Sequence, residues 1–101
     1  MGTCSGGDGV HGESRGNGVL GESIAFGGIG VRGTSSDGIG GSFSGGPNGV
    51  PLRLEPSSQQ GPPTTGNHSM GELFVDTQGV LYFCKQSGPP GVAVWKTVTL
   101  T

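Results

Sequence analysis

The chain begins a repeat with Gly9-Val10-His11-Gly12-Glu13-Ser14 and copies it nine residues later as Gly18-Val19-Leu20-Gly21-Glu22-Ser23. Further copies begin at Gly30, Gly38 and Gly49, the last of them divergent, and the shared pattern is Gly-[Val/Ile]-x-Gly-x-Ser. The starts lie 9, 12, 8 and 11 residues apart, and five copies within residues 9–54 are too many for chance. Self-similarity of this kind is the signature of a fold assembled from small stacked units.

Each copy is expected to form a short β-strand, in which alternate side chains point to opposite faces. One face of the strands is then small and apolar and the other mostly polar, which is typical of half-buried strands. Turn residues such as Gly45-Gly46-Pro47-Asn48 separate the copies. The longest connection, residues 24–29, is expected to form a bulged corner with Ile24 or Phe26 tucked beneath it. The apolar face supplies the expected core, which consists of Val10, Val19, Val31, Ile39, Val50, Leu52 and Leu54.

The composition gives one chain too little apolar surface for a core of its own. Only 30% of the 101 residues are hydrophobic, and 24 are glycine. Ordering the backbone costs about 1–2 kcal/mol per residue, and glycine loses the most freedom of all residues. Disorder is disfavoured, because charged residues make up only 12% of the chain and Val and Ile recur at regular places. The remaining choices are a repetitive hydrogen-bonded fold and a core shared between chains.

Coil counting favours the shared core. A β-helix made from one chain needs about 18 residues for each coil, so residues 9–54 would give roughly two to three coils, at or below the minimum for stability. When three chains intertwine, every copy makes a full layer, and the narrow axis explains the glycines. The sequence therefore predicts an all-β fold, with an intertwined homotrimeric triangular β-helix (a β-prism) over residues 1–54. A monomeric glycine-rich β-solenoid is the alternative.

The C-terminal part has a different composition. Residues 55–70 are expected to be a Pro/Gly-rich linker of polyproline type, and residues 71–101 a small β cap. In the cap, Leu73–Asp76 and Val80–Lys85 predict a β-hairpin with Gly79 in a left-handed conformation. Val92–Leu100 is expected to add a third strand, and a cap would cover the unpaired edge of the last repeat layer.

Candidate chemistry is sparse. A net charge of −2 with scattered Lys and Arg predicts no nucleic-acid partner, and no apolar run reaches the ~20 residues needed for membrane insertion. His11 and His68 lack metal-ligand spacing, which predicts no metal site. Gly28, Gly30 and Gly33 form a GxGxxG with no helix after it, so no cofactor is expected. Catalytic residues need a pocket, and a narrow prism offers none, so the sequence predicts a protein that is not an enzyme.

The two cysteines, Cys4 and Cys84, are not expected to pair. Five layers at ~4.8 Å would separate the ends of the repeat by about 24 Å, whereas a disulfide requires Cα atoms less than about 7 Å apart. We expect Cys84 to be a buried thiol and Cys4 to be free or to form an intermolecular bond.

The copies at residues 9–54, followed by a Pro/Gly segment and a short terminal β unit, resemble the triangular trimeric β-helices of phage tail spikes, needles and fibres. They are also similar to glycine-rich repeat proteins of bacterial surfaces, although the spacing here varies between 8 and 12 residues. The resemblance implies a structural trimerisation module at the C-terminal end of a phage tail fibre or cell-surface fibre. Such a module would lie outside the cell or on the virion, with itself and an upstream fibre segment as partners.

The alternative function is a receptor- or glycan-binding tip of such a fibre, with a host surface glycan as the partner. Tyr82 and Trp95 would then be the recognition residues, although packing within the cap is the simpler role for both.

Overall fold

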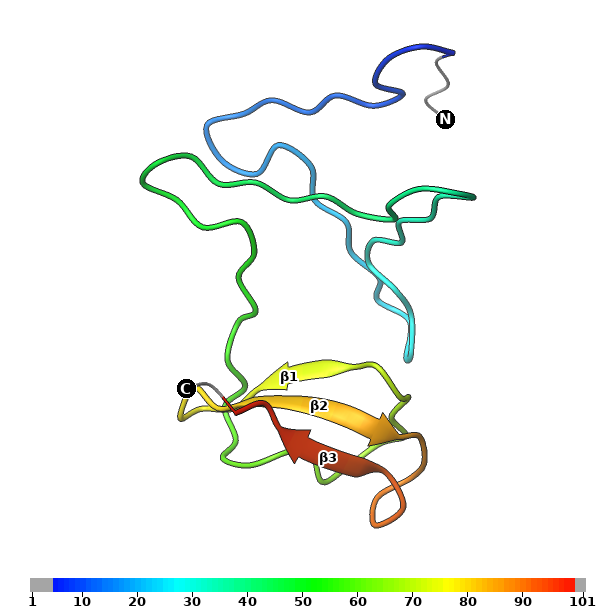
Figure 1. Ribbon diagram of the computed structural model, residues 1–101, viewed down its shortest axis with the longest axis vertical. Helices are drawn as coiled ribbons and strands as arrows, with labels where there is room; N and C mark the ends of the chain where they lie inside the picture. The colour runs from blue at the N-terminus through cyan, green and yellow to red at the C-terminus, as the bar shows by residue number, and fades with distance from the viewer. Residues whose placement is uncertain (1–4, 100–101) are drawn as a thin grey trace. The chain divides into compact units, whose positions relative to one another are not determined.

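The computed structural model describes residues 5–99 and divides the chain into two units, Met1–Ser42 and Phe43–Thr101 (Figure 1). Its strands are β1 (Leu73–Val75), β2 (Leu81–Gln86) and β3 (Val94–Thr97), and all belong to the second unit. No helix occurs within residues 5–99, so the described chain is all-β. The prediction for Cys4 concerns a residue outside this range.

The three strands form one antiparallel sheet in the order β1-β2-β3. The predicted hairpin is confirmed: Phe74 lies opposite Tyr82, and Gly79 has a φ of 81° in the turn. The third strand is also present, but it is shorter than the predicted range of 92–100. It starts late because the N–H groups of Val92 and Ala93 both donate to the Pro89 carbonyl in a turn, at 3.0 Å each.

The segment predicted as a linker is bonded to the sheet along much of its length. The Ser57 N–H donates to the Val75 carbonyl at 2.8 Å, and the Thr77 N–H donates to the Gln59 carbonyl at 2.9 Å. Further along, His68 forms an antiparallel bridge with Gly88. β1 is an edge strand, so the backbone N–H and C=O groups that point away from β2 need other partners. The Ser57 N–H is such a partner for the Val75 carbonyl. Residues 57–70 are therefore part of the terminal unit.

The sheet has one well-covered face, which we call the inner face and define by Phe74, Tyr82, Cys84 and Trp95. Cys84 is completely buried, and its free thiol donates to the Gln86 carbonyl at 3.3 Å. The Trp95 ring makes edge contacts with Phe74 and His68, at centroid distances of 6.1 and 5.3 Å. The prediction of a buried Cys84 is confirmed.

The repeats contain no strand within residues 5–56. Only two backbone–backbone hydrogen bonds occur there, from Gly28 to Ala25 and from Gly49 to Gly46, and each closes a local turn at 3.0 Å. The copies of the motif are therefore stretches of chain without a strand partner in their own molecule. The strand pairing expected between chains stays a prediction.

Candidate functional site

The apolar side chains of the repeats are exposed in the single chain. Val10, Val19 and Val31, which occupy the same position in three copies, are 72%, 68% and 73% exposed. Ile39, Val50 and Leu52 are also largely exposed, and Leu54 is 38% exposed. None of the seven side chains predicted to form the core is buried by its own molecule, and they form a continuing series along the repeat.

The corner at residues 24–29 differs from the prediction. Ile24 and Phe26 are both almost completely exposed, so neither is tucked beneath the corner, and this prediction is wrong. The corner is closed by the Gly28 N–H bond to the Ala25 carbonyl, with Gly27 at a φ of 75°. So tight a turn leaves no chain underneath it against which a large side chain could pack.

The last position of the motif has a role that the sequence analysis missed. The Ser14 hydroxyl accepts a hydrogen bond from the Gly16 N–H, and the Ser35 hydroxyl accepts one from the Gly38 N–H, both at 3.0 Å. Serine hydroxyls commonly stabilise turns in this way. The signal was in the sequence, because a glycine follows each of these serines by two or three residues. The motif serine therefore stabilises the turn that ends its copy.

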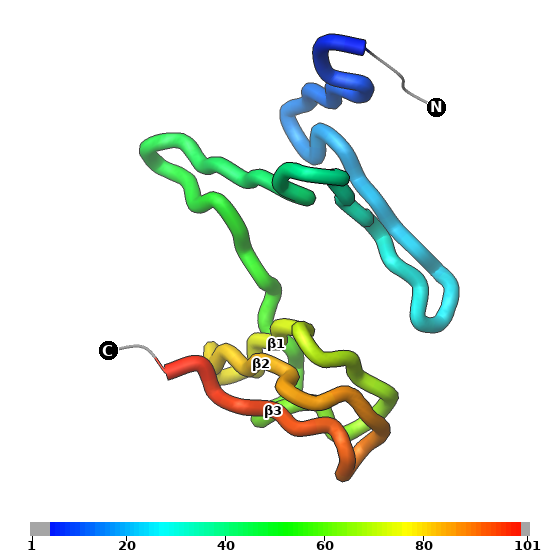
Figure 2. Tube along the Cα trace, turned by 45° about the vertical axis from the view of Figure 1, so that its right-hand side comes forward, coloured from blue at the N-terminus to red at the C-terminus, as the bar shows by residue number. Residues whose placement is uncertain are grey.

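The fourth residue of one copy and the first residue of the next copy are both glycine, and their backbones lie in close contact. A Cβ placed on Gly18 would lie 2.8 Å from the Gly12 carbonyl oxygen, and one on Gly30 would lie 2.8 Å from that of Gly21. Real Cβ contacts are essentially never this short. Figure 2 shows the consequence, since the chain runs out and back between neighbouring copies. We call these contacts the glycine crossings.

The third glycine crossing changes the alignment of the fourth copy. Gly33 approaches Gly40, and a Cβ on Gly40 would lie 3.1 Å from the Gly33 carbonyl oxygen. By this criterion the fourth copy begins at Gly40, two residues after the start predicted from the sequence. Ile39 then occupies the position immediately before a copy, as Ile29 does before Gly30.

In the terminal unit, a buried carboxylate joins two distant segments. Asp76 is 1% exposed and accepts hydrogen bonds from the N–H groups of Gly61, Gln78 and Val80, each at 2.9 Å. The hydrogen bond from the Gly61 N–H is the largest cause of the lowered pKa of Asp76. Burial acts to raise this pKa, and the bonds from Val80 and Gln78 lower it further. No sequence pattern indicated this site, because Gly61 lies 15 residues away from Asp76.

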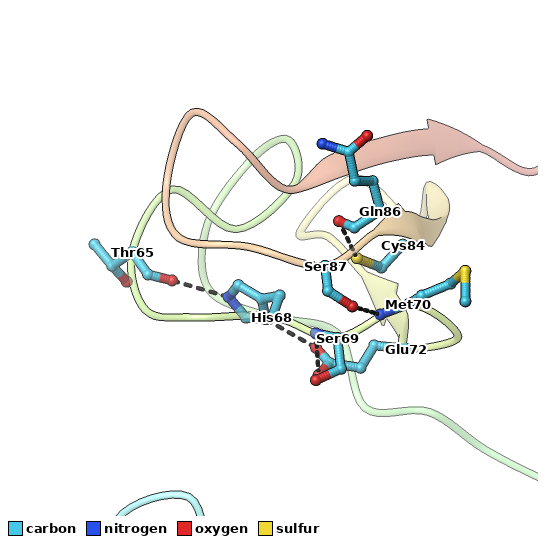
Figure 3. A network of polar contacts seen from close by, with 8 residues as sticks. All are labelled: Thr65, His68, Ser69, Met70, Glu72, Cys84, Gln86 and Ser87. Atoms are coloured by element: carbon cyan, nitrogen blue, oxygen red, sulfur yellow. Dashed lines mark hydrogen bonds and ion pairs between the residues drawn. The ribbon is translucent and has the colours of Figure 1, made fainter.

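A second polar cluster surrounds His68 (Figure 3). Its Nδ1 lies 2.8 Å from Glu72 Oε1, and its Nε2 lies 2.9 Å from the Thr65 carbonyl oxygen. Because both partners are acceptors, only the doubly protonated ring satisfies both bonds. The pKa of His68 is accordingly raised, first by the Glu72 hydrogen bond and then by the Thr65 bond. The Glu72 carboxylate also accepts a bond from the Ser69 N–H, so the cluster holds residues 65–72 together.

The predicted recognition residues, Tyr82 and Trp95, are both half-buried on the inner face. Trp95 packs between His68 and Phe74, and its Nε1 is buried without a hydrogen-bond partner among the residues described. An aromatic platform for sugar binding needs an open ring face, and the Trp95 ring is instead in contact with two other rings. The exposed aromatic ring of the sheet is Phe83, on the opposite face.

Metal-binding geometry is absent from residues 5–99, where no three His, Cys, Asp or Glu side chains come together. His11 lies 3.7 Å from both Asp8 and Glu13, but all three side chains are largely exposed. The same residues include no helix with the length and hydropathy required to cross a bilayer. Comparisons with protein families, curated proteins and solved structures found no match to this chain.

Proposed function

We propose that this chain is a structural trimerisation module of a fibre. Residues 9–54 would intertwine with two further copies as a triangular β-helix, and the terminal unit would cap its end. The observation that carries the proposal is the series of exposed apolar side chains along a backbone that has almost no hydrogen bonds of its own. Soluble monomers rarely expose apolar surface of this extent, and its usual meaning is a protein–protein contact.

Burial of this surface would favour association. Fully burying a Val, Leu or Ile side chain contributes about 1.5–3 kcal/mol, and each chain exposes all seven of these side chains. Ordering the repeat backbone costs more than this gain, so hydrogen bonds between the chains would have to contribute as well. The repeat also exposes Leu20, Ile24, Phe26, Ile29 and Phe43, so further apolar surface is available for contact with the other copies.

The backbone supports the same proposal. Buried N–H and C=O groups must be paired, and a strand from a neighbouring chain would supply partners to each copy. The serine-stabilised turns and the glycine crossings connect successive copies without a strand ladder, which leaves the edges of each copy open for a neighbour. Three is the smallest number of strands that can enclose an axis, and closure removes exposed edges.

The place of this module in a phage tail fibre or a cell-surface fibre follows from the resemblance of its repeats. On that basis we propose a location outside the cell or on the virion. A purely structural role is favoured over glycan recognition, because the Trp95 ring packs between His68 and Phe74 and Tyr82 is half-buried.

The test is the mass in solution. Light scattering should give a species of three chains of 10.0 kDa each, and this species should persist on dilution because the chains share one hydrogen-bonded wall. A monodisperse monomer with the circular dichroism of a folded β protein would refute the proposal.

A further inference from the structure

The face of the terminal sheet opposite the inner face carries a partly exposed apolar patch, flanked by Lys96 on β3. We call it the outer face and define it by Leu73, Val75, Leu81, Phe83 and Val98. Leu73 and Phe83 are directly opposed across β1 and β2, and they are 51% and 37% exposed. Val75 lies opposite Leu81, and the Val98 N–H donates to the Leu81 carbonyl at 2.8 Å, which continues the face beyond β3. Alternation along the strands places all five side chains on the same side.

Neither the inner face nor the free edge of the sheet is suited to a large contact. The inner face is occupied by His68 and the segment that contains it. The free edge is β3, where Lys96 is exposed opposite Phe83. A lysine on an edge strand is a common device that prevents pairing with another edge. The outer face is what remains for association.

The length of the chain identifies the occupant. Leu54 belongs to the proposed trimer core, and the sheet is reached at Ser57, whose N–H is bonded to the Val75 carbonyl. Three residue steps span no more than about 11 Å even when fully extended. Three terminal units would therefore be held close to the end of the prism, at the high effective concentration that a short connection imposes.

We infer that the outer face is a second contact surface between copies of this chain, formed around the threefold axis where the prism ends. The inference rests on the proposed trimer and adds to it, because the contact uses packed side chains instead of shared strands. Each copy would bury its Leu73–Phe83 pair against a neighbouring terminal unit. The sheet would then be covered on both faces.

Hydroxyl-radical labelling of the full chain tests the contact directly. The rate of hydroxyl-radical labelling at Phe83 and Leu73 is measured in the wild-type oligomer and in a Val31→Asp variant. This substitution lies in the repeat and leaves the terminal unit intact. We expect labelling of both residues to be several-fold slower in the oligomer. A wild-type trimer with the same labelling as the variant overturns the inference and leaves the trimer standing. A monomeric wild-type chain overturns both, whereas a Val31→Asp variant that stays trimeric with both residues exposed overturns the contact alone.

Charge substitutions give an independent readout. Leu73→Glu should lower the thermal midpoint of the oligomer, whereas Thr64→Glu adds the same charge at an exposed position of the terminal unit and should change nothing. Leu73→Met, which keeps the apolar contact, should restore the wild-type midpoint. Equal midpoints for Leu73→Glu and Thr64→Glu would contradict a contact at this face.

Discussion

The two halves of this chain treat their apolar side chains in opposite ways. In the repeats, Val19 and Val31 lie open to solvent, and the local hydrogen bonds close turns. In the terminal unit, a three-stranded sheet buries Cys84 and pairs Trp95 with Phe74. The glycine-rich repeat fixes the path of its own chain but buries none of its apolar side chains, whereas a few aromatic residues allow a small sheet to cover one face by itself.

The largest expected effect comes from a charge on the apolar face of a repeat. Val31→Asp would place three carboxylates at one height in the proposed core, where desolvation costs several kcal/mol per group. We expect loss of the trimer at neutral pH, measured by light scattering. Burial raises the pKa of such a carboxyl, so the destabilisation grows as pH rises through that pKa and is partly relieved in acid.

The neighbouring residue is the matched control for this effect. Arg32→Asp alters charge on the polar face and should cost less than about 1 kcal/mol per chain. If the two variants lose trimer equally, or Arg32→Asp loses more, the faces of the strand are assigned the wrong way round.

A glycine crossing gives the next largest effect. In Gly21→Ala the new Cβ would overlap the Val31 side chain and the Gly30 carbonyl, and forced overlap of this kind costs about 1–3 kcal/mol. The thermal midpoint of the oligomer should fall. Gly16→Ala is the control, because a Cβ there meets only the Ser14 hydroxyl at 3.9 Å. A Gly21→Ala protein as stable as Gly16→Ala would show that the crossing is dispensable.

The third prediction concerns the terminal unit alone. Asp76→Asn removes a charged acceptor from three backbone donors, and Asn cannot satisfy all of them with its single oxygen. Urea unfolding followed by Trp95 fluorescence should show a clear loss of stability, while Asp37→Asn on the exposed repeat should show none. Because the pKa of Asp76 is lowered, its contribution is present above the ordinary carboxyl pKa and is lost as pH falls through the lowered value. An unchanged acid transition in Asp76→Asn would contradict this role.

The smallest expected effect is at His68. Its pKa is raised, so its contribution is complete below the ordinary histidine pKa of 6.5 and is lost as pH rises through the folded value. His68→Gln should cost about 1 kcal/mol in mild acid and less at higher pH. The exposed His11→Gln is the control for loss of a histidine, and an equal loss of stability in the two variants would argue against the cluster.

The sequence predicted the hairpin because alternation and one glycine specify it locally: Gly79 supplies the left-handed turn between two apolar strands. The sequence did not predict that residues 57–70 belong to the terminal unit. Bonds such as that from the Ser57 N–H to the Val75 carbonyl join backbone groups, so they do not depend on residue type. The Asp76 site was missed for a related reason, as Gly61 contributes only its N–H. The start of the fourth copy was ambiguous because Gly38 and Gly40 look alike until one of them meets Gly33.

The glycine crossings have a practical consequence for the loops between them. Each crossing fixes where a copy ends and the next begins, and the chain in between contributes no long-range hydrogen bond. The loop from Ser23 to Gly30 already carries extra residues, with Phe26 fully in solvent at its tip. We therefore expect this loop to accept an inserted peptide without a change in the copies on either side, and in the proposed trimer the insert would be displayed three times.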